Sequence, residues 1–451
     1  MRLSHVVPLA LLGAVQGAVS TISAFGNKFF YENGTQFFLK GVAYQLTSDD
    51  PLVDSEQCAR DAALMRDLGA NSIRVYHVDA SKDHSDCMST LADAGIYLLV
   101  DLDTFDTYIL PVRPVPSPGA LWILTSPWWN QTQYERFTEV MDEFQKYDNT
   151  LGFFVGNEVI AQASQSLAAP FIKAAARDMK AYRNSKGYRN IPVGYSAADI
   201  AELRPMLQDF LTCGGNTSDS VDFFALNSYE WCGDVDYNTS GYANLEVGAA
   251  NFPVPIFFSE TGCNTVRPRT FEDQAAIFGE EMINDWSGSI VYEWIEETND
   301  YGLISYGPPV DPTATGSNIV AGFTRQGTPT PVSPDFSNLK SQWATLNPTG
   351  IKSSDMDTKS LSTRSCPPSS TGSAGWLLNG DVQLPTVGET LVGTTYTTSA
   401  PTGSDGSPVA NSTSASASST SSSQSPANPS MQFTKMTAAL LGLLMSLTLM
   451  L

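Results

Sequence analysis

The sequence predicts an α/β protein built as a TIM-type (β/α)8 barrel and followed by a disordered Ser/Thr-rich stalk. Eight short apolar runs alternate with helical patterns between about residues 20 and 347, as repeated βα units do. The runs are almost continuously apolar, which is typical of parallel strands that are covered on both faces. Strands in that number favour a closed barrel over an open sheet.

Each predicted element follows from its local pattern. The strands, in chain order, are Phe37–Tyr44, Ser72–Tyr76, Ile96–Leu102, Leu151–Glu158, Ile191–Ala197, Val221–Tyr229, Val254–Thr261 and Ser289–Trp294. The helices include Ser55–Leu68, Tyr134–Tyr147, Pro170–Lys186 and Phe271–Trp286. In Tyr134–Tyr147 the apolar residues recur at i, i+3, i+4 and i+7 and so share one face, which we interpret as core rather than as a binding surface.

Both ends of the chain carry targeting signals, and we expect both terminal segments to be removed from the mature protein. Residues 1–17 combine the basic Arg2 with an apolar run, which indicates a secretory signal peptide. Residues 431–451 end in an apolar tail shorter than the roughly 20 residues of a membrane-spanning helix. With the polar, small-residue stretch before it, the tail indicates attachment of a glycosylphosphatidylinositol (GPI) anchor, for which Ser423, Ser425 and Asn428 are candidate residues. The alternative is a tail-anchored helix.

Between these signals we expect three parts. Residues 20–347 form the barrel domain, and residues 348–400 form a post-barrel segment tied back by Cys366. Residues 401–430 are so rich in Ser and Thr that they cannot bury a core, and they predict a flexible, O-glycosylated stalk. The predicted location is the outer face of the plasma membrane, with the cell wall as a second possibility.

Cysteines and sequons support export. In an oxidising compartment the six cysteines predict three disulfides, and composition leaves every pairing open. They are Cys58, Cys87, Cys213, Cys232, Cys263 and Cys366. Five Asn-x-Ser/Thr sequons predict glycosylation at surface positions; they are Asn33, Asn130, Asn216, Asn238 and Asn411.

Charge and histidine content exclude several function classes. A formal net charge of −22 would repel nucleic acid and anionic membranes, so we expect no polyanionic partner. His5, His77 and His84 are the only histidines, and His5 leaves with the signal peptide. A Ser-His-Asp hydrolase or a histidine metal site therefore has little to work with. We expect carboxylates to supply the acid–base chemistry, with no metal or cofactor.

Two glutamates stand where a barrel carries its active site. Glu158 ends the fourth predicted strand and Glu260 lies near the end of the seventh, and sites form at the carboxyl ends of barrel strands. Retaining glycosidases need two carboxyl groups about 5–5.5 Å apart, one as nucleophile and one as acid and then base. The alternative is that each glutamate caps a helix or pairs with an arginine.

At this point the chain resembles the fungal GPI-anchored 1,3-β-glucanosyltransferases of glycoside hydrolase family 72, in the shorter branch that lacks a cysteine-rich carbohydrate-binding module. The resemblance rests on several blocks in the family's order. They are KGVAYQ (Lys40–Gln45), NSIRVYHVD (Asn71–Asp79), CMSTLADAGIYLLVDLDT (Cys87–Thr104), FFVGNEV (Phe153–Val159), PVGYSAADI (Pro192–Ile200), SETGCN (Ser259–Asn264) and VYEW (Val291–Trp294).

The resemblance implies roles for individual residues. Glu158 would be the acid/base and Glu260 the nucleophile. The implied glucan contacts are Tyr76, Asp103, Asn157, Asp199, Arg204 and Tyr292. Aromatic faces suit the apolar face of a sugar, and amides and carboxylates bind its hydroxyls; barrel packing is the alternative for the two tyrosines, and a surface ion pair for Arg204. The implied disulfides join Cys58 to Cys87, Cys232 to Cys263, and Cys213 to Cys366.

The resemblance also implies an activity. The expected reaction cleaves a β-1,3-glucan internally and transfers the new reducing end to the non-reducing end of another glucan. A hydrolytic β-1,3-glucanase is one alternative, and a catalytically weak glucan-binding wall protein is the other. Four residues depart from the family pattern near the expected site, namely Ala43, Asp103, Thr261 and Trp294. The loss of a tyrosine at Thr261 matters most, because its hydroxyl could orient the nucleophile.

Overall fold

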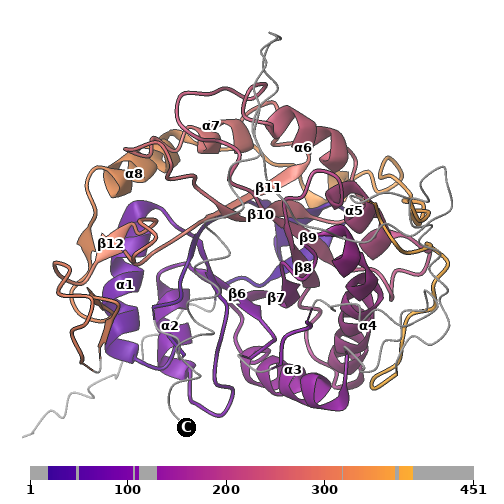
Figure 1. Ribbon diagram of the computed structural model, residues 1–451, viewed down its shortest axis with the longest axis horizontal. Helices are drawn as coiled ribbons and strands as arrows, with labels where there is room; N and C mark the ends of the chain where they lie inside the picture. Colours follow the sequence, from indigo (N-terminus) through magenta and orange to yellow (C-terminus); the bar gives the residue numbers. More distant parts are fainter. Residues whose placement is uncertain are drawn as a thin grey trace, which may run out of the picture. The chain divides into compact units, whose positions relative to one another are not determined.

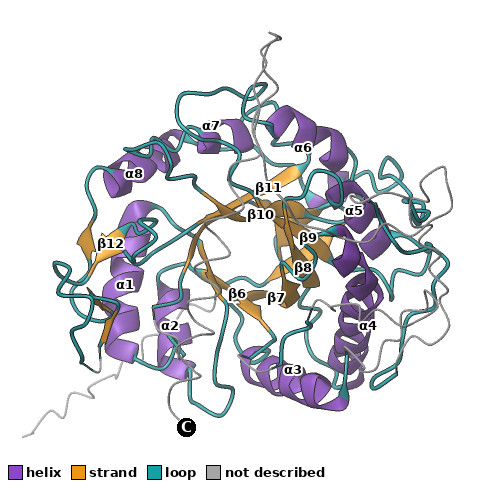
Figure 2. Ribbon diagram, viewed as in Figure 1, coloured by secondary structure: helices purple, strands orange, loops and turns teal. Residues whose placement is uncertain are grey.

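A closed barrel of eight parallel strands forms the centre of the computed structural model, which describes residues 19–46, 50–104, 107–110, 129–316, 318–370 and 375–389. Around the barrel the strands follow the order β10-β11-β4-β5-β6-β7-β8-β9, which confirms the predicted fold class. Figures 1 and 2 show the helices in a ring around these strands. The barrel strands are β4 (Leu39–Ala43), β5 (Ser72–Val75), β6 (Tyr97–Asp101), β7 (Thr150–Asn157), β8 (Val193–Ala198), β9 (Phe223–Asn227), β10 (Ile256–Thr261) and β11 (Trp286–Val291).

The helices follow the strands as βα units require. They are α1 (Ser55–Leu68), α2 (Ser85–Asp93), α3 (Gln131–Phe144), α4 (Ala169–Ser185), α5 (Arg204–Thr212), α6 (Tyr242–Ala249), α7 (Asp273–Ile277) and α8 (Asp335–Thr345), with 3-10 turns at Ala163–Ala168 and Ser353–Asp355. Helix α1 has the predicted bounds because Asp54 caps its first turn and Gly69, at φ 96°, ends it. Helix α3 begins at a capping box formed by Asn130 and Gln133.

The predicted helix Phe271–Trp286 is too long. Helix α7 ends at Ile277, and Gly279 follows in the turn beyond it, where a glycine weakens helical structure. Trp286 is instead the first residue of β11 and stacks on Phe258 of β10, with ring centroids 4.2 Å apart. A short apolar run of this kind does not distinguish strand from helix by periodicity alone.

An antiparallel sheet closes the base of the barrel, where the strands begin. It consists of β1 (Ile22–Phe25), β2 (Lys28–Tyr31) and β3 (Gln36–Phe37). Phe29 contacts Phe223 and Phe257 at the starts of two barrel strands, with ring centroids 6.3 and 5.9 Å apart. Because Phe37 belongs to this sheet, the first barrel strand begins two residues later than the predicted Phe37–Tyr44.

Two further small sheets lie between β11 and α8. Strands β12 (Ile304–Ser305) and β15 (Thr330–Pro331) form one pair, and β13 (Ile319–Val320) and β14 (Phe323–Thr324) form the other.

The chain beyond α8 returns along the outside of the barrel. Cys366 forms a disulfide with Cys213 at the end of α5, and Trp376 is buried beside Phe210 of the same helix, with ring centroids 5.8 Å apart. Further along, the Gly388 N–H donates to the Trp129 carbonyl at 2.9 Å. The other disulfides join Cys58 to Cys87 and Cys232 to Cys263. All three pairs are those that the family resemblance implies.

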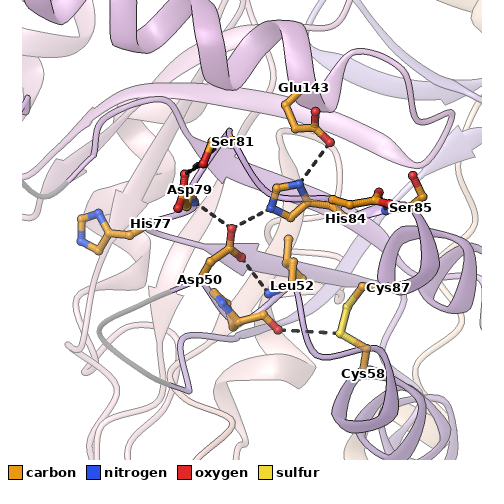
Figure 3. Close-up of polar contacts among 12 residues, drawn as sticks. Asp50, Leu52, Cys58, His77, Asp79, Ser81, His84, Ser85, Cys87 and Glu143 are labelled. Carbon is orange, nitrogen blue, oxygen red and sulfur yellow. Dashed lines mark hydrogen bonds and ion pairs between the residues drawn. A yellow bond between two sulfur atoms is a disulfide. The ribbon is translucent and has the colours of Figure 1, made fainter.

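A buried histidine connects three elements near the carboxyl ends of the first strands (Figure 3). His84, which precedes α2, has Nε2 2.6 Å from Asp50 Oδ2 in the β4–α1 loop and Nδ1 3.1 Å from Glu143 Oε1 in α3. Asp50 also accepts the backbone N–H groups of Leu52 and Asp79, each at 2.8 Å. The cluster therefore ties Asp50, a few residues before α1, to α3 and to the segment before α2.

The predicted signal peptide, the stalk, the anchor signal and the sequon at Asn411 lie outside the described residues. Within the described ranges, no helix is both long and apolar enough to cross a bilayer.

Candidate active site

Glu158 and Glu260 lie at the carboxyl ends of β7 and β10, where the sequence places them. Glu158 directly follows β7 and adopts φ 50°, a left-handed conformation that is uncommon outside glycine and is often found at functional sites. Its N–H donates to the Ser196 carbonyl of β8 at 2.9 Å, which holds this conformation. Glu260 lies within β10 and is 7% exposed.

Two phenols and a guanidinium surround the Glu260 carboxylate. Tyr76 donates to Oε1 at 2.9 Å, and Tyr229 donates to Oε2 at 2.7 Å. The Arg74 Nη1 lies 3.7 Å from Oε1. Donors that converge on both oxygens fix the orientation of a carboxyl group. This environment suits a nucleophile.

Arg74 is the fully buried cation at the centre of the site. It forms a bidentate pair with Asp101 at 2.9 and 3.1 Å, and its Nη2 donates to Asn157 Oδ1 at 3.1 Å. Its guanidinium also lies over the Tyr76 ring, 4.4 Å from the centroid. Burial opposes the charge of Arg74, but Asp101 and Tyr76 more than compensate, and the pKa is raised.

Glu158 has a different environment from Glu260. Burial and the neighbouring Glu260 charge raise the pKa of Glu158 to about 7. Its Oε1 accepts a hydrogen bond from Asn227 Nδ2 at 3.0 Å, and Asn227 pairs in register with Glu260 across β9 and β10. A glutamate with this pKa holds its proton at mildly acidic pH and can donate it.

The Asn157 side chain is oriented by hydrogen bonds to its amide oxygen. Its Oδ1 accepts from Arg74 and from Asn227, each at 3.1 Å. With the oxygen occupied, the Nδ2 group can donate to a ligand hydroxyl. The structure thus supports the expected sugar contact without showing one.

Asp199 and Arg204 contact each other. They form an ion pair with both side chains less than 10% exposed, and Asp199 Oδ2 also accepts from Ser228 at 2.7 Å. The pair is therefore mostly buried rather than a surface pair, and Ser228 links it to the strand end that carries Tyr229. Burial lowers the pKa of Arg204, although Glu230 opposes this effect.

Three tyrosines form an aromatic wall at the barrel mouth, namely Tyr229, Tyr292 and Tyr301. Their ring centroids lie 5.4 to 6.4 Å apart in edge-on contacts. Tyr229 and Tyr292 each follow a barrel strand by one or two residues, whereas Tyr301 comes from the loop after β11. Amphipathic walls of this kind suit the apolar faces of sugar rings.

Thr261 does not face the nucleophile. Its Oγ1 lies 3.2 Å from Asp273 Oδ2 and 3.3 Å from the Tyr242 hydroxyl, because successive strand residues point to opposite faces of the sheet. The tyrosine of the family pattern is thus replaced here by a residue whose hydroxyl does not contact Glu260. The phenols that bind Glu260 come from other strand ends.

The other three departures are also buried. Ala43 belongs to the apolar cluster inside the barrel, and Trp294 belongs to the main core. The backbone N–H of Trp294 donates to the Ala43 carbonyl at 2.9 Å. Asp103 is 6% exposed, and its Oδ1 has no hydrogen-bond partner among the described residues. Burial and the nearby Asp101 raise the pKa of Asp103 well above its ordinary value. A protonated acid there is chemically close to the asparagine of the family pattern.

The sequons differ in their accessibility. Asn33, Asn216 and Asn238 are exposed. Asn130 is only partly exposed, and its Oδ1 accepts the Gln133 N–H as the cap of α3.

Sequence reasoning missed several residues of the site, namely Arg74, Asp101, Asn227, Tyr229 and Tyr301. A charged Arg74 inside an otherwise apolar strand was a usable signal, because such a residue must be paired when buried. Asn227 and Tyr229 lie at the end of a predicted strand and met the same test as the glutamates. Tyr301 lies in a loop without periodicity, so no sequence pattern indicates it.

A (β/α)8 barrel whose mouth combines a buried acid, a hydrogen-bonded carboxylate and an aromatic wall defines a carbohydrate-active enzyme of the glycoside hydrolase type. Residues 12–314 match the family model of the glucanosyltransferases, glycoside hydrolase family 72. The chain belongs to this family.

Known relatives agree with the assignment. The chain is 41% identical over 366 residues to the 1,3-beta-glucanosyltransferase gas1 of Schizosaccharomyces pombe, covering 79% of this chain and 61% of that protein. It is 38% identical to the 1,3-beta-glucanosyltransferase PGA4 of Candida albicans, covering 81% and 75%. Gas2p of Saccharomyces cerevisiae, solved with laminaritetraose and laminaripentaose, superposes with a TM-score of 0.69 at 36% identity, covering 82% and 75%. The chain thus spans less than two thirds of some relatives.

Proposed function

We propose that the protein is a retaining β-1,3-glucan transglycosylase, with Glu260 as nucleophile and Glu158 as acid/base. The observation that carries the proposal is the contrast between the two carboxyl groups. Tyr76, Tyr229 and Arg74 surround Glu260 with donors, whereas burial raises the pKa of Glu158 to about 7. One group is thereby prepared to attack and the other to donate a proton.

The proposed reaction has two halves. A Glu260 oxygen attacks the anomeric carbon of the donor glucan, and the bond between that carbon and the glycosidic oxygen breaks. The Glu158 proton passes to the departing oxygen. The covalent glycosyl intermediate then reacts with the 3-hydroxyl at the non-reducing end of a second glucan. Glu158 takes the proton of that hydroxyl, and Glu260 leaves as a carboxylate.

The proposed substrate is β-1,3-glucan as both donor and acceptor. The laminari-oligosaccharides bound to Gas2p support it, as does the aromatic wall of Tyr229, Tyr292 and Tyr301. Water could replace the acceptor, and the same two glutamates would then give a hydrolase. We further propose export, GPI attachment and action at the cell surface. The disulfides, which are typical of extracellular proteins, support this location.

The test is to incubate a soluble form that ends before Met436 with a reduced laminari-oligosaccharide of one length and to separate the products by size. Products longer than the substrate, absent with Glu158→Gln and with Glu260→Gln, would support transfer. Only shorter products would indicate hydrolysis. Binding without turnover would indicate a glucan-binding protein.

A further inference from the structure

A third glutamate lies beside the two that carry the proposed chemistry. Glu293 comes two residues after β11, directly after Tyr292, and is 4% exposed. Its N–H donates to the Tyr301 carbonyl at 3.1 Å, and its own carbonyl accepts from the Leu303 N–H at 3.0 Å. These contacts hold the backbone of Glu293 on both sides, so its side chain has a fixed origin in the barrel mouth.

The Glu293 carboxyl group has polar neighbours but no paired cation. Its Oε1 accepts from Asn299 Nδ2 at 2.7 Å, and Asn299 Oδ1 in turn accepts the Tyr301 N–H at 3.1 Å. In the part of the chain that is described, no Lys, Arg or His nitrogen lies within ion-pair distance of this carboxyl, and the nearby Arg325 pairs with Glu297. An ionised carboxylate buried without a cation is costly, whereas the neutral acid is not.

The surrounding charges act in the same direction. Burial raises the pKa of Glu293 well above its ordinary value, and the negative charges of Glu297 and Glu260 raise it further. Asn299 and Arg325 oppose the effect without reversing it.

We infer that Glu293 is a positioning residue of this site. As a protonated carboxylic acid it holds Asn299 and, through Asn299, Tyr301, and it adds no further negative charge beside Glu260. The carbonyl oxygen of a protonated carboxyl group still accepts a hydrogen bond, so the neutral acid keeps its contact with Asn299. The inference rests on the proposed function, because it assigns Tyr301 to the wall that would contact glucan.

The protonation state can be read without activity. We expect the infrared difference spectrum of the wild-type protein minus Glu293→Gln, at pH 6, to contain a protonated carboxylic acid band. Loss of a carboxylate band instead would overturn the inference. Glu297→Gln is the matched control, because Glu297 belongs to the same loop but pairs with Arg325, and it should lose a carboxylate band.

The positioning role is tested with laminari-oligosaccharides. Glu293→Gln keeps a neutral group that accepts and donates, so kcat/KM should stay within about threefold, and both limbs of its pH profile should stay in place. Glu293→Leu removes the hydrogen bond that holds Asn299, and KM should rise about five- to tenfold with a smaller change in kcat. A pH limb displaced by Glu293→Gln, or an unchanged KM in a folded Glu293→Leu protein, would overturn the role. An inactive wild-type enzyme would count against the proposed function, while the infrared result would still decide the charge of Glu293.

Discussion

At the scale of single residues, the site assigns different tasks to chemically identical groups by changing what surrounds them. Glu260 has two phenolic donors and a guanidinium within reach. Glu158 has one amide donor and a neighbouring negative charge. The difference comes from neighbouring strand ends, because the residues that contact the glutamates belong to or follow β5 and β9.

The raised pKa of Glu158 predicts an alkaline limit to activity. Transfer should decline as pH rises through about 7, because the group then loses the proton that the leaving glucan needs. The measurement is the pH dependence of kcat/KM. A laminari-oligosaccharyl fluoride, whose leaving group needs no proton, is the control for the first half of the reaction. If its cleavage shows the same alkaline limb, Glu158 is not the acid.

The phenols around Glu260 predict graded losses. Tyr76→Phe and Tyr229→Phe each remove one hydrogen bond to a carboxylate. Each should cost roughly 1.5–3 kcal/mol of transition-state stabilisation, which reduces kcat/KM by about 10- to 150-fold. Thr261→Val is the matched control, since Thr261 contacts Asp273 and Tyr242 instead; it should reduce the melting temperature and leave kcat unchanged. Equal losses in all three variants would contradict this assignment.

At the scale of elements, the sequence predicts the barrel strands well and their surroundings less well. The predicted strand Leu151–Glu158 agrees closely with β7. A long apolar run is typical of a barrel strand, because both faces of such a strand are covered. The sheet at the base was not predicted, since β1 and β2 are four residues each and too short to show alternation. The strand-end rule found Glu158 and Glu260 but not Arg74, which lies within a strand.

The His84 cluster predicts pH-dependent stability. Each ring nitrogen faces a carboxylate (Figure 3), so the charged imidazolium fits best. Burial opposes this charge, but Asp50 and Glu143 outweigh burial and raise the pKa of His84; Asp79, Asp83 and Lys146 are the other charged groups nearby. Since the folded pKa is above the unfolded 6.5, the stabilisation is complete below about pH 6.5 and is lost as pH rises through the folded value.

Thermal melts of the wild type and His84→Gln should therefore differ most near pH 5, with the difference shrinking by roughly 2–4 °C toward pH 8. The subtraction removes titrations that both proteins share, such as that of Glu246, whose pKa is raised to about 8 by burial and Asp285. A difference that stays constant with pH would refute a charged His84.

At the scale of the whole molecule, the described fold extends beyond the family match. That match ends at residue 314, yet α8 follows it, and the Trp343 indole donates to Gln274 of α7 at 2.8 Å. The post-barrel segment follows α8, and its Cys366 forms the disulfide with Cys213 at the end of α5. We expect stability and catalysis to be separated here, because no contact described for Glu158 or Glu260 comes from this segment.

Cys366→Ser tests that separation. The disulfide with Cys213 spans 153 residues of sequence, and its loss should reduce the free energy of unfolding by roughly 2–5 kcal/mol. The kcat should not change at temperatures where the variant stays folded. Denaturant unfolding and transfer assays on the same samples measure both, with Cys213→Ser as the matched variant. A large fall in kcat without unfolding would show that the segment supports the site.

Two segments that meet at the base of the barrel are synthesised at very different times. Thr35 directly precedes β3, near the start of the described chain. Lys352, which comes 317 residues later, forms a bridge with it, and the Lys352 Nζ lies 2.6 Å from the Thr35 hydroxyl. Translation at about 5–20 residues per second separates these partners by roughly 15–60 seconds. During that interval Thr35 has been synthesised and Lys352 has not. The last contact at the base can form only after almost the entire barrel has left the ribosome.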